Sequence, residues 1–526
     1  MHHPVDRCRR VRGLACRALD GTFVSWPLSR GPVVCRRRSR RPMAAARVGW
    51  SARFAAIALV ALGVGHLAPA GAAAQDDERQ VGVVVGQRVD GYRGIWHGQE
   101  PTRDEFHYKY SGGLATYTCK HIPMAVHAPA VRRTYFVYGG AKGEGQERLT
   151  GRQRLTAMIG VYDHASGLVE RPTQVHDKAT FDPHDNPSLS LDGDGNLWVV
   201  ISGRGRGRPG WTYRSVEPYS IEQFELVDRG EYTYPQIWYR PPGGFLLLFT
   251  KYLGGRQLFF KTSDDGRTWS DDVQLAAFGG HYQLSWPHGE RVGTVFNWHP
   301  GGNVDKRTNL YYAETSDRGR TWYTIDGRRL ELPLTEVDNA ALMHDFAAEG
   351  KLTYLNDMKY DEEGRPVVFI VVSERWQPGP GANQRWTVAH WDGREWLFHD
   401  VGPCDHNYDK GLVEVTPERW RVLGPSEPGP QPFHTGGDLA LWESTDEGRT
   451  WTLTRQITGG DPYNHTYVRP VVDADDEFFA YWADGNSAEP SPCRLYFANH
   501  DLSAIWQLPE QMEGPTARPT RYQPSR

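Results

Sequence analysis

Side chains suited to acid–base chemistry recur along the chain in clusters rich in histidine, tyrosine, asparagine and arginine. The clusters fall between strand-like apolar runs. They are His121, His184-Asp185-Asn186, Tyr232 with Tyr234, His281-Tyr282, His299, His344-Asp345, Asp405-His406-Asn407-Tyr408, and Asn464-His465 with Tyr467 and Arg469. A single histidine in a strand more often serves structure, but this many recurrences favour a shared ligand-binding site.

The residue types in these clusters suit one reaction better than another. Glycoside hydrolysis usually needs two carboxylates at a defined separation, and the clusters offer few unpaired Asp or Glu residues. β-Elimination from a uronate needs groups that neutralise the carboxylate, a base for the C5 proton and an acid for the departing O4. Histidine, with a pKa near 6.5, and tyrosine, with a pKa near 10, can supply the base and the acid. The clusters therefore favour a lyase that cleaves an anionic, uronate-containing polysaccharide.

A repeated turn indicates which elements position these clusters. The pattern [ST]-x-D-x-G-R-T-W occurs three times, beginning at Thr262, Thr315 and Ser444. Its aspartate can accept hydrogen bonds from backbone N–H groups of its own turn, and its glycine can supply a left-handed conformation. The turn aspartates are predicted to be Asp264, Asp317 and Asp446. We interpret the repeats as structural turns between antiparallel strands that do not contact substrate.

The spacing of the repeats predicts the fold. The first two begin 53 positions apart, about one four-stranded blade of a β-propeller. Aromatic residues make up 12% of the chain, 57 Gly and 36 Pro suit short strands joined by tight turns, and no long amphipathic helix is apparent. We predict an all-β fold, a single β-propeller of four-stranded antiparallel blades, with seven blades and six as the alternative. Equivalent loops of a propeller meet at one end of its central channel, so the polar clusters should share one pocket.

The repeats resemble the Asp-box, or BNR repeat, of the sialidase-like β-propellers. GYRGIW, KYSGGLATY, CKHIPMAV, YFVYGG, DPHDNPSLSLDGDG and YTYPQIWY resemble one branch of secreted bacterial BNR-repeat propellers, which includes ulvan lyases and enzymes acting on rhamnose–glucuronate linkages. The resemblance covers about residues 90–510 and implies a polysaccharide lyase. A sialidase would carry Arg-Ile-Pro where this chain has Arg93 followed by Gly94, so sialic acid is not the expected substrate.

The same resemblance implies roles for particular residues. In these lyases a pair of histidines about twenty residues apart, then a tyrosine, then an arginine carry out the elimination. Here His164 and His184 have that separation and are followed by Tyr234 and Arg256, with His121 as a competing first base. The substrate carboxylate could be bound by Arg256, Lys251 or Arg469. Further substrate-binding residues predicted from the clusters are Asn186, His281, His299, His406, Asn407, Tyr408 and His465.

The beginning of the chain is interpreted as a leader. Residues 1–42 are rich in arginine and are expected to precede the true start at Met43, and residues 43–74 have the pattern of a secretory signal peptide. Residues 75–89 form a short N-terminal segment, 90–510 the propeller, and 511–526 a polar tail. We therefore expect a secreted or periplasmic protein with no stable membrane insertion.

Charge and cysteine content limit the partners. Residues 1–53 hold 13 Arg and two acidic residues, so the formal charge of −4 becomes −15 for the remainder, which argues against nucleic acid. Outside the leader only Cys119, Cys404 and Cys493 remain, without metal-binding spacing. DGDG at Asp192–Gly195 is similar to a calcium loop but lacks its terminal Glu, and we interpret it as a hairpin turn. No cofactor or metal is predicted to be required.

Two other functional classes stay open beside the lyase. One is a glycoside hydrolase, either sialidase-like or acting on a rhamnosyl-glucuronate. The other is a non-catalytic propeller that binds carbohydrate, because a fold does not by itself imply an activity. All three have a polysaccharide or oligosaccharide as the partner. The segment GRGRGRPG at Gly203–Gly210 is interpreted as a basic loop that lines an anionic cleft.

Overall fold

A computed structural model describes residues 80–113, 118–141, 154–240 and 242–524. They belong to the compact unit Ala73–Arg526. The predicted leader and signal peptide lie outside the described residues. Within these residues the helical elements are short 3-10 turns, and no helix is long and apolar enough to cross a membrane. These turns are η1 (Thr118–Lys120), η2 (Pro129–Val131), η3 (Pro183–Asp185), η4 (Pro300–Gly302) and η5 (Val304–Lys306).

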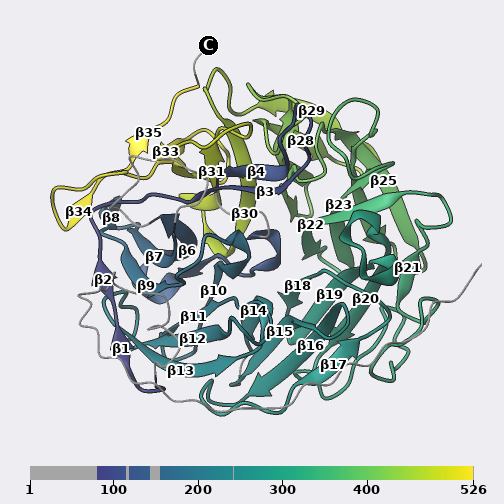
Figure 1. Ribbon diagram of the computed structural model, residues 1–526, viewed down its shortest axis with the longest axis horizontal. Helices are drawn as coiled ribbons and strands as arrows, with labels where there is room; N and C mark the ends of the chain where they lie inside the picture. The colour runs from purple at the N-terminus through teal and green to yellow at the C-terminus, as the bar shows by residue number, and fades with distance from the viewer. Residues whose placement is uncertain (1–79, 114–117, 142–153, 241, 525–526) are drawn as a thin grey trace, which may run out of the picture. The chain divides into compact units, whose positions relative to one another are not determined.

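The described strands form seven successive four-stranded antiparallel units, which we call blades 1 to 7 (Figure 1). In each blade the chain runs from an inner strand outwards. Blade 1 contains β5 (Ala125–Ala128), β6 (Arg133–Ala141), β7 (Leu155–Asp163) and β9 (Thr173–Asp177), with β8 (Leu168–Glu170) also paired to β7. Blade 2 contains β10 (Pro187–Leu191), β11 (Leu197–Ile201), β12 (Gly210–Ser215) and β13 (Phe224–Gly230).

The remaining blades repeat this order. Blade 3 contains β14 (Thr233–Tyr239), β15 (Phe245–Tyr252), β16 (Arg256–Ser263) and β17 (Val273–Ala276). Blade 4 contains β18 (Gln283–His288), β19 (Arg291–Trp298), β20 (Thr308–Thr315) and β21 (Leu342–His344). Blade 5 contains β22 (Leu352–Tyr360), β23 (Pro366–Ser373), β24 (Arg385–Trp391) and β25 (Trp396–Pro403). Blade 6 contains β26 (Leu412–Val415), β27 (Trp420–Glu427), β28 (Asp438–Ser444) and β29 (Thr452–Gln456). Blade 7 contains β30 (Asn464–Asp475), β31 (Phe478–Gly485), β32 (Leu495–Ala498) and β33 (Ile505–Gln507).

The inner strands contact one another in a closed cycle. The contacts run from β5 through β10, β14, β18, β22 and β26 to β30, and β30 returns to β5. That last contact includes one parallel bridge, between Val126 and Val472. Aromatic side chains fill the blades beside this seam; Phe478 stacks on Phe497 at 4.2 Å between ring centroids. The predicted all-β propeller is confirmed, and the pairing gives seven four-stranded units.

Short strands outside the blades reinforce the ring. Near the start of the described chain, β1 (Val84–Val85) pairs with β13 and β2 (Gln87–Arg88) pairs with β9. Near its end, β34 (Thr516–Ala517) pairs with β8 in blade 1, and β35 (Thr520–Arg521) pairs with β33 in blade 7. The segment predicted as a polar tail therefore bridges the first and last blades.

A hairpin precedes blade 1 and contacts the loops of later blades. It consists of β3 (Trp96–Pro101) and β4 (Tyr108–Gly113), and Figure 1 shows it beside β30 and β31. Lys109 of this hairpin forms an ion pair with Asp305 in blade 4. The ring centroids of Tyr110 and Tyr408 lie 4.7 Å apart, and Tyr408 directly precedes blade 6 in the chain. The hairpin thus covers the blade 4 to blade 6 side of the channel where the inner strands begin.

The three repeated turns connect the third and fourth strands of blades 3, 4 and 6. Gly266, Gly319 and Gly448 adopt the predicted left-handed conformation, with φ of 71°, 89° and 77°. The Asp317 carboxylate accepts hydrogen bonds from the backbone N–H and the hydroxyl of Thr321, at 2.9 and 2.6 Å.

The first repeat departs from the predicted alignment by one residue. Asp265, not Asp264, accepts the hydrogen bonds of the turn, including one from the backbone N–H of Thr268 at 2.7 Å. Asp264 has a side chain that is 90% exposed and contacts Arg318 instead. In the other two turns the hydroxyls of Thr315 and Ser444 accept a hydrogen bond from the N–H of the turn glycine. In the first turn the Ser263 hydroxyl does this, accepting from the Gly266 N–H at 2.7 Å. Two adjacent aspartates made this register ambiguous in the sequence.

Candidate functional site

Three predicted residues meet where the inner strands of blades 1 to 3 begin. His121 precedes β5, His184 lies in η3 before β10, and Tyr234 is the second residue of β14. The Tyr234 ring centroid lies 5.6 Å from that of His121 and 6.0 Å from that of His184. Nε2 of His121 lies 3.0 Å from the backbone oxygen of His184. We call these three residues the His–Tyr cluster.

Irregular backbone places two members of this cluster. Tyr234 has a φ of 54°, which is unusual for a bulky residue. The pairing of β14 with β15 shifts between Thr233 and Gln236, and such a bulge re-aims side chains. His184 is fixed by the cap of η3, because the Asp182 carboxylate accepts a hydrogen bond from its backbone N–H at 3.0 Å. The cluster therefore depends on turns at the strand starts.

A charged network surrounds one side of the His184 ring. Asp182 contacts Nδ1 of His184, and Arg204 lies 3.0 Å from the same nitrogen. Arg204 and Arg208 donate to the second oxygen of Asp182 at 2.7 and 2.6 Å. Both arginines come from the β11–β12 loop, which is the basic loop predicted from GRGRGRPG. Because Nδ1 faces this network, Nε2 lies on the opposite side of the ring.

The surroundings of the cluster lower the pKa of its histidine His184 and raise the pKa of its tyrosine Tyr234. Burial and the nearby Arg204 charge lower the pKa of His184, although Asp182 acts in the opposite direction. Burial raises the pKa of Tyr234 well above its ordinary value, and Tyr252 and Tyr282 act in the same direction. Burial opposes ionisation of Asp182, but His184 and the two arginines hold the pKa of this carboxyl well below its usual range. Near neutral pH the cluster thus pairs a neutral imidazole with a protonated phenol.

Two guanidinium groups from adjacent blades lie beside the cluster. Arg256 begins β16, and its guanidinium carbon lies 5.6 Å from the ring centroids of both Tyr252 and Tyr282. The Arg204 guanidinium lies 6.0 Å from the Tyr252 ring. Tyr282 in turn lies 5.5 Å from Tyr234. Guanidinium groups bind carboxylates in forked geometry, so this arrangement can hold an anionic sugar next to an acid and a base.

Further positive charge lies behind these residues. The Arg307 guanidinium lies 4.3 Å from the Tyr354 ring and donates to the Tyr408 hydroxyl at 2.9 Å. The Lys120 ammonium lies 4.7 Å from the Tyr282 ring. Burial lowers the pKa of Lys120, and lowers that of Lys410 further. This end of the channel therefore presents cationic and aromatic groups together.

Several predicted substrate-binding residues lie at this end but are 2% exposed or less. The His299 ring contacts the Asn297 side chain at 3.1 Å. Asn407 donates to the backbone oxygen of Arg375 at 2.9 Å, and Arg469 donates to that of Asn356 at 3.2 Å. Such bonds position neighbouring loops. The residues in this position are Asn186, His281, His299, His406, Asn407, Tyr408 and Arg469.

Three predicted residues are not brought to the His–Tyr cluster. His164 follows the third strand of blade 1, and its ring contacts Asp475 and Thr134. Lys251 forms an ion pair with Asp272 at 2.5 Å. His465 is fully buried in blade 7, where Asp461 and Trp482 each lie 3.0 Å from its ring nitrogens. We therefore leave these three residues out of the candidate site.

Four residues that the structure places in or beside the site were not predicted from the sequence. These are Lys120, Arg204, Tyr252 and Arg307. Arg204 lies in a loop that was interpreted only as a basic lining. Lys120 adjoins His121 in CKHIPMAV, a segment that shows the resemblance, and Tyr252 adjoins Lys251, a predicted carboxylate partner. Arg307 begins RTNLYYAETSD, a segment that shows the same resemblance.

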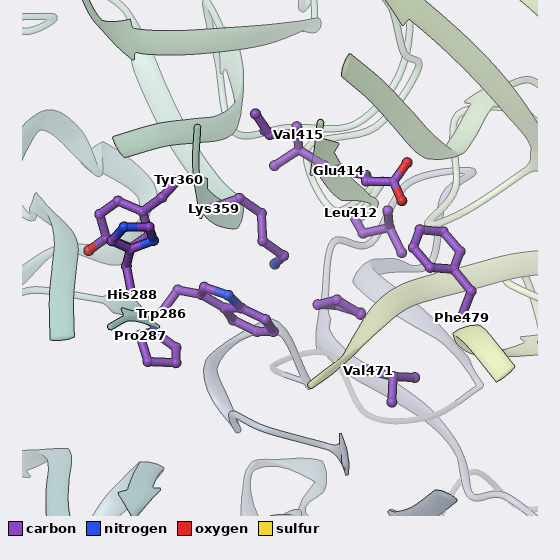
Figure 2. Close-up of a pocket in the computed structure, with 12 residues that line it drawn as sticks. Trp286, Pro287, His288, Lys359, Tyr360, Leu412, Glu414, Val415, Val471 and Phe479 are labelled. Carbon is purple, nitrogen blue, oxygen red and sulfur yellow. The ribbon is translucent and has the colours of Figure 1, made fainter. Parts of the chain in front are cut away.

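The opposite end of the inner strands has a different lining. A cavity of about 180 Å³ lies there, and its lining includes Trp286, Lys359, Glu414 and Phe479 (Figure 2). The Lys359 ammonium lies 3.4 Å from the Trp286 ring centroid and 3.0 Å from both Asp357 oxygens. Burial lowers the pKa of Lys359 to about 8, although Asp357 opposes that shift. This cavity lies apart from the His–Tyr cluster, at the far end of the inner strands.

Comparisons with known proteins agree with this architecture. The model of a BNR repeat-containing family member matches residues 153–402. An ulvan lyase from Alteromonas sp. (strain LOR) is 22% identical over 382 residues, which are 63% of this chain and 74% of that protein. Ulvan Lyase-PL25 from Pseudoalteromonas sp. (strain PLSV) is 22% identical over 405 residues, which are 67% of this chain and 78% of that protein.

Solved structures show the same fold. A polysaccharide lyase described as PL25 ulvan lyase superposes with a TM-score of 0.62 at 18% identity, covering 79% of this chain and 96% of that one. The polysaccharide lyase Uly1 gives a TM-score of 0.55 at 11% identity, covering 80% of this chain and all of the other. At these identities the likeness establishes the fold.

Proposed function

From a BNR-repeat β-propeller that is similar to ulvan lyases, we propose a polysaccharide lyase that cleaves an anionic, uronate-containing polymer of the ulvan class by β-elimination. The observation that carries the proposal is the His184 ring 6.0 Å from the Tyr234 ring, with the Arg204 and Arg256 guanidinium groups both close to the neighbouring Tyr252. The ulvan lyase names of the relatives support the substrate class. The chain would act outside the cell, where such a polymer is found, as the predicted signal peptide implies.

Each chemical step has a residue suited to it. Arg204 and Arg256 would pair with the uronate carboxylate and withdraw charge from it, which makes the C5 proton more acidic. Nε2 of His184 would take that proton, and the Tyr234 hydroxyl would donate its proton to O4 as the C4–O4 bond breaks. The C5–H electron pair becomes the C4=C5 double bond of the product. One product carries an unsaturated uronate and the other a new hydroxyl end.

The other members of the site would support these steps. His121 packs against the Tyr234 ring and contacts the His184 backbone, so it would position both and remains the alternative base. Tyr252 lies between the two arginines and would contact the sugar ring or the carboxylate. Lys120 and Arg307 would stabilise negative charge on the carboxylate from behind Tyr282.

The carboxylates near the cluster argue against hydrolysis. Asp182 is bonded to Arg204 and Arg208, and Asp185 is fully buried beside Lys178 and Arg208. A hydrolase needs one carboxyl to protonate the leaving group and another to act as base or nucleophile. Both acids are instead held as ion-pair partners, so the elimination uses the available groups better.

A product assay tests the proposal. The purified chain is incubated with ulvan and other uronate polysaccharides while ultraviolet absorbance of the unsaturated uronate and reducing ends are followed together. Equal increases in both are expected. Reducing ends without absorbance would indicate a hydrolase. Binding without either product would indicate a carbohydrate-binding module.

A further inference from the structure

A second cluster of titratable groups lies at the seam between blades 1 and 7. It contains His127 from β5, His164 after β7 and Asp475 at the end of β30. Their possible ligand atoms all lie within 4.8 Å of one another. His127 is 8% exposed and His164 is 6% exposed. The cluster combines two buried imidazoles with one carboxylate and shares no residue with the His–Tyr cluster.

A hydrogen bond from Nδ1 of His127 determines that Nε2, the nitrogen that faces Asp475, is the acceptor. Nδ1 of His127 lies 3.0 Å from the backbone oxygen of Asp473. A carbonyl oxygen only accepts, so Nδ1 carries the hydrogen atom and Nε2 of the neutral ring has the lone pair. That Nε2 lies 3.9 Å from a carboxylate oxygen of Asp475.

The His164 ring is held in the same manner. Its Nε2 lies 2.8 Å from the Thr134 hydroxyl, which can accept the ring hydrogen. Its Nδ1 lies 3.1 Å from the other Asp475 oxygen and 3.5 Å from Glu477. Nε2 of His127 has no hydrogen-bond partner among the described residues, and Nδ1 of His164 faces two carboxylates, those of Asp475 and Glu477. When Nε2 of His164 donates to Thr134, Nδ1 of His164 and Nε2 of His127 both present lone pairs to the Asp475 carboxylate, an arrangement that a bound cation stabilises.

We propose that this cluster binds a divalent transition-metal ion of the zinc class, with His127, His164 and Asp475 as ligands. Zinc prefers imidazole nitrogen and carboxylate oxygen at about 2.0–2.2 Å in tetrahedral geometry, which places ligand atoms about 3.4 Å apart. Nδ1 of His164 and Nε2 of His127 lie 3.1 and 3.9 Å from the Asp475 oxygens, one distance below that value and one above it. Calcium and magnesium prefer oxygen ligands and would not select two imidazoles.

Neighbouring groups complete the site. Glu477 can supply a fourth oxygen, and the Tyr162 hydroxyl donates to its carboxylate at 3.3 Å. The contacts of Asp473 and Thr134 orient the two rings from behind, as the outer partners of metal-bound histidines do. A cavity of about 920 Å³, bordered by Tyr162, His164 and Glu477, gives the ion access from solvent.

The position of the site indicates its role. β5 and β30 are joined by a single parallel bridge, whereas strands within a blade share several. Two ligands come from blade 1 and one from blade 7, so a bound ion would hold the first and last blades together. Because the ligands converge only in the closed ring, metal binding stabilises that state.

Metal content and thermal unfolding test the proposal without reference to activity. The purified chain is stripped with a chelator, reloaded with ZnCl₂, desalted and analysed for bound metal. One zinc per chain is expected, with a rise in Tm of about 2–5 °C over the stripped protein. His127→Gln and Asp475→Asn should each lose the bound zinc and the zinc-dependent rise. His500→Gln is the matched control: the His500 ring pairs with Glu414 of blade 6 and supplies no ligand atom to the cluster, so the bound zinc and the zinc-dependent rise should both be unchanged.

Two results would overturn the assignment. Absence of stoichiometric zinc in the wild-type chain after reloading would do so without any variant. Equal loss of Tm in His127→Gln with and without zinc would assign the cluster to an ordinary ion pair between histidine and aspartate. A failure of the lyase assay would leave these outcomes unaffected.

Discussion

The two ends of the inner strands differ in chemistry although the same strands form both. Where the strands begin, the His–Tyr cluster and two arginines gather from blades 1 to 3. Where they end, the cavity in Figure 2 combines apolar side chains with Lys359. The first end receives the loops between second and third strands and those between blades. The second end receives mostly short turns, including the three repeats. The residues of the proposed active site therefore lie at the end that receives the loops between blades, and the repeated structural turns lie at the other end.

Removing the proposed acid or base at the first end should lower turnover more than any other change. Tyr234→Phe and His184→Gln are each expected to lower kcat by 10²–10⁴-fold, because proton transfer to or from the substrate is lost. Initial rates of unsaturated-uronate formation measure the change, and thermal unfolding checks that the fold is retained. His288→Gln, at the opposite end, should keep at least half of the wild-type rate. A comparable loss in that control would remove the distinction between the two ends.

Removing the carboxylate partner should have the next largest effect. Arg256→Met is expected to lower kcat/KM by about 10–100-fold, since a hydrogen bond to a charged group contributes roughly 1.5–3 kcal/mol. Lys251→Met offers a matched control from the same blade, because Lys251 pairs with Asp272 instead of facing the cluster. Steady-state kinetics should find the control within threefold of wild type. Equal losses in both variants would restore Lys251 as a carboxylate partner.

Changes in the repeated turns should affect stability but not turnover. Asp317→Ala leaves the partly buried turn around Thr321 without its charged acceptor and is expected to cost about 1–3 kcal/mol of unfolding free energy. Asp264→Ala should cost under about 0.5 kcal/mol, because that side chain is exposed and contacts only Arg318 at the surface. Urea unfolding compares the two variants. The opposite order would mean that Asp264 carries the turn after all.

The last prediction concerns pH. Burial lowers the pKa of His281 to about 4 and that of His406 to about 3, below the value near 6.5 expected for the unfolded chain. Between these values the unfolded state binds more protons, so stability is fully present above pH 6.5 and falls as pH drops towards 4. Urea midpoints at pH 7, 5.5 and 4.5 measure this decline. Activity should persist into alkaline solution, because the Tyr234 pKa lies well above 10; an alkaline limb near pH 8 would contradict that role.

The sequence predicted the parts of the molecule that depend on local patterns. The repeats predicted propeller blades because an Asp-Gly turn needs only neighbouring residues. His184 and Tyr234 lie at strand starts within segments whose motifs are local. The register of the first repeat was wrong because Asp264 and Asp265 are adjacent and either could fill the pattern.

Residues far apart in sequence could not be placed in the same way. His164 was paired with His184 by their spacing of twenty, but it follows a third strand, which ends away from the mouth where inner strands begin. The metal-site ligands illustrate the same limit. His164 and Asp475 are separated by most of the propeller and meet only through ring closure. Arg307 likewise reaches the site from blade 4 through the geometry of the ring.

The single bridge between β5 and β30 has a consequence for biosynthesis. Blade 1 is translated early, yet the neighbour that covers its inner edge emerges from the ribosome only when residues 464–475 have been made. Until then a nascent chain exposes an unpaired strand, which is prone to aggregation. Folding during synthesis can complete the individual blades in turn, but the circle closes only in the last stage of translation.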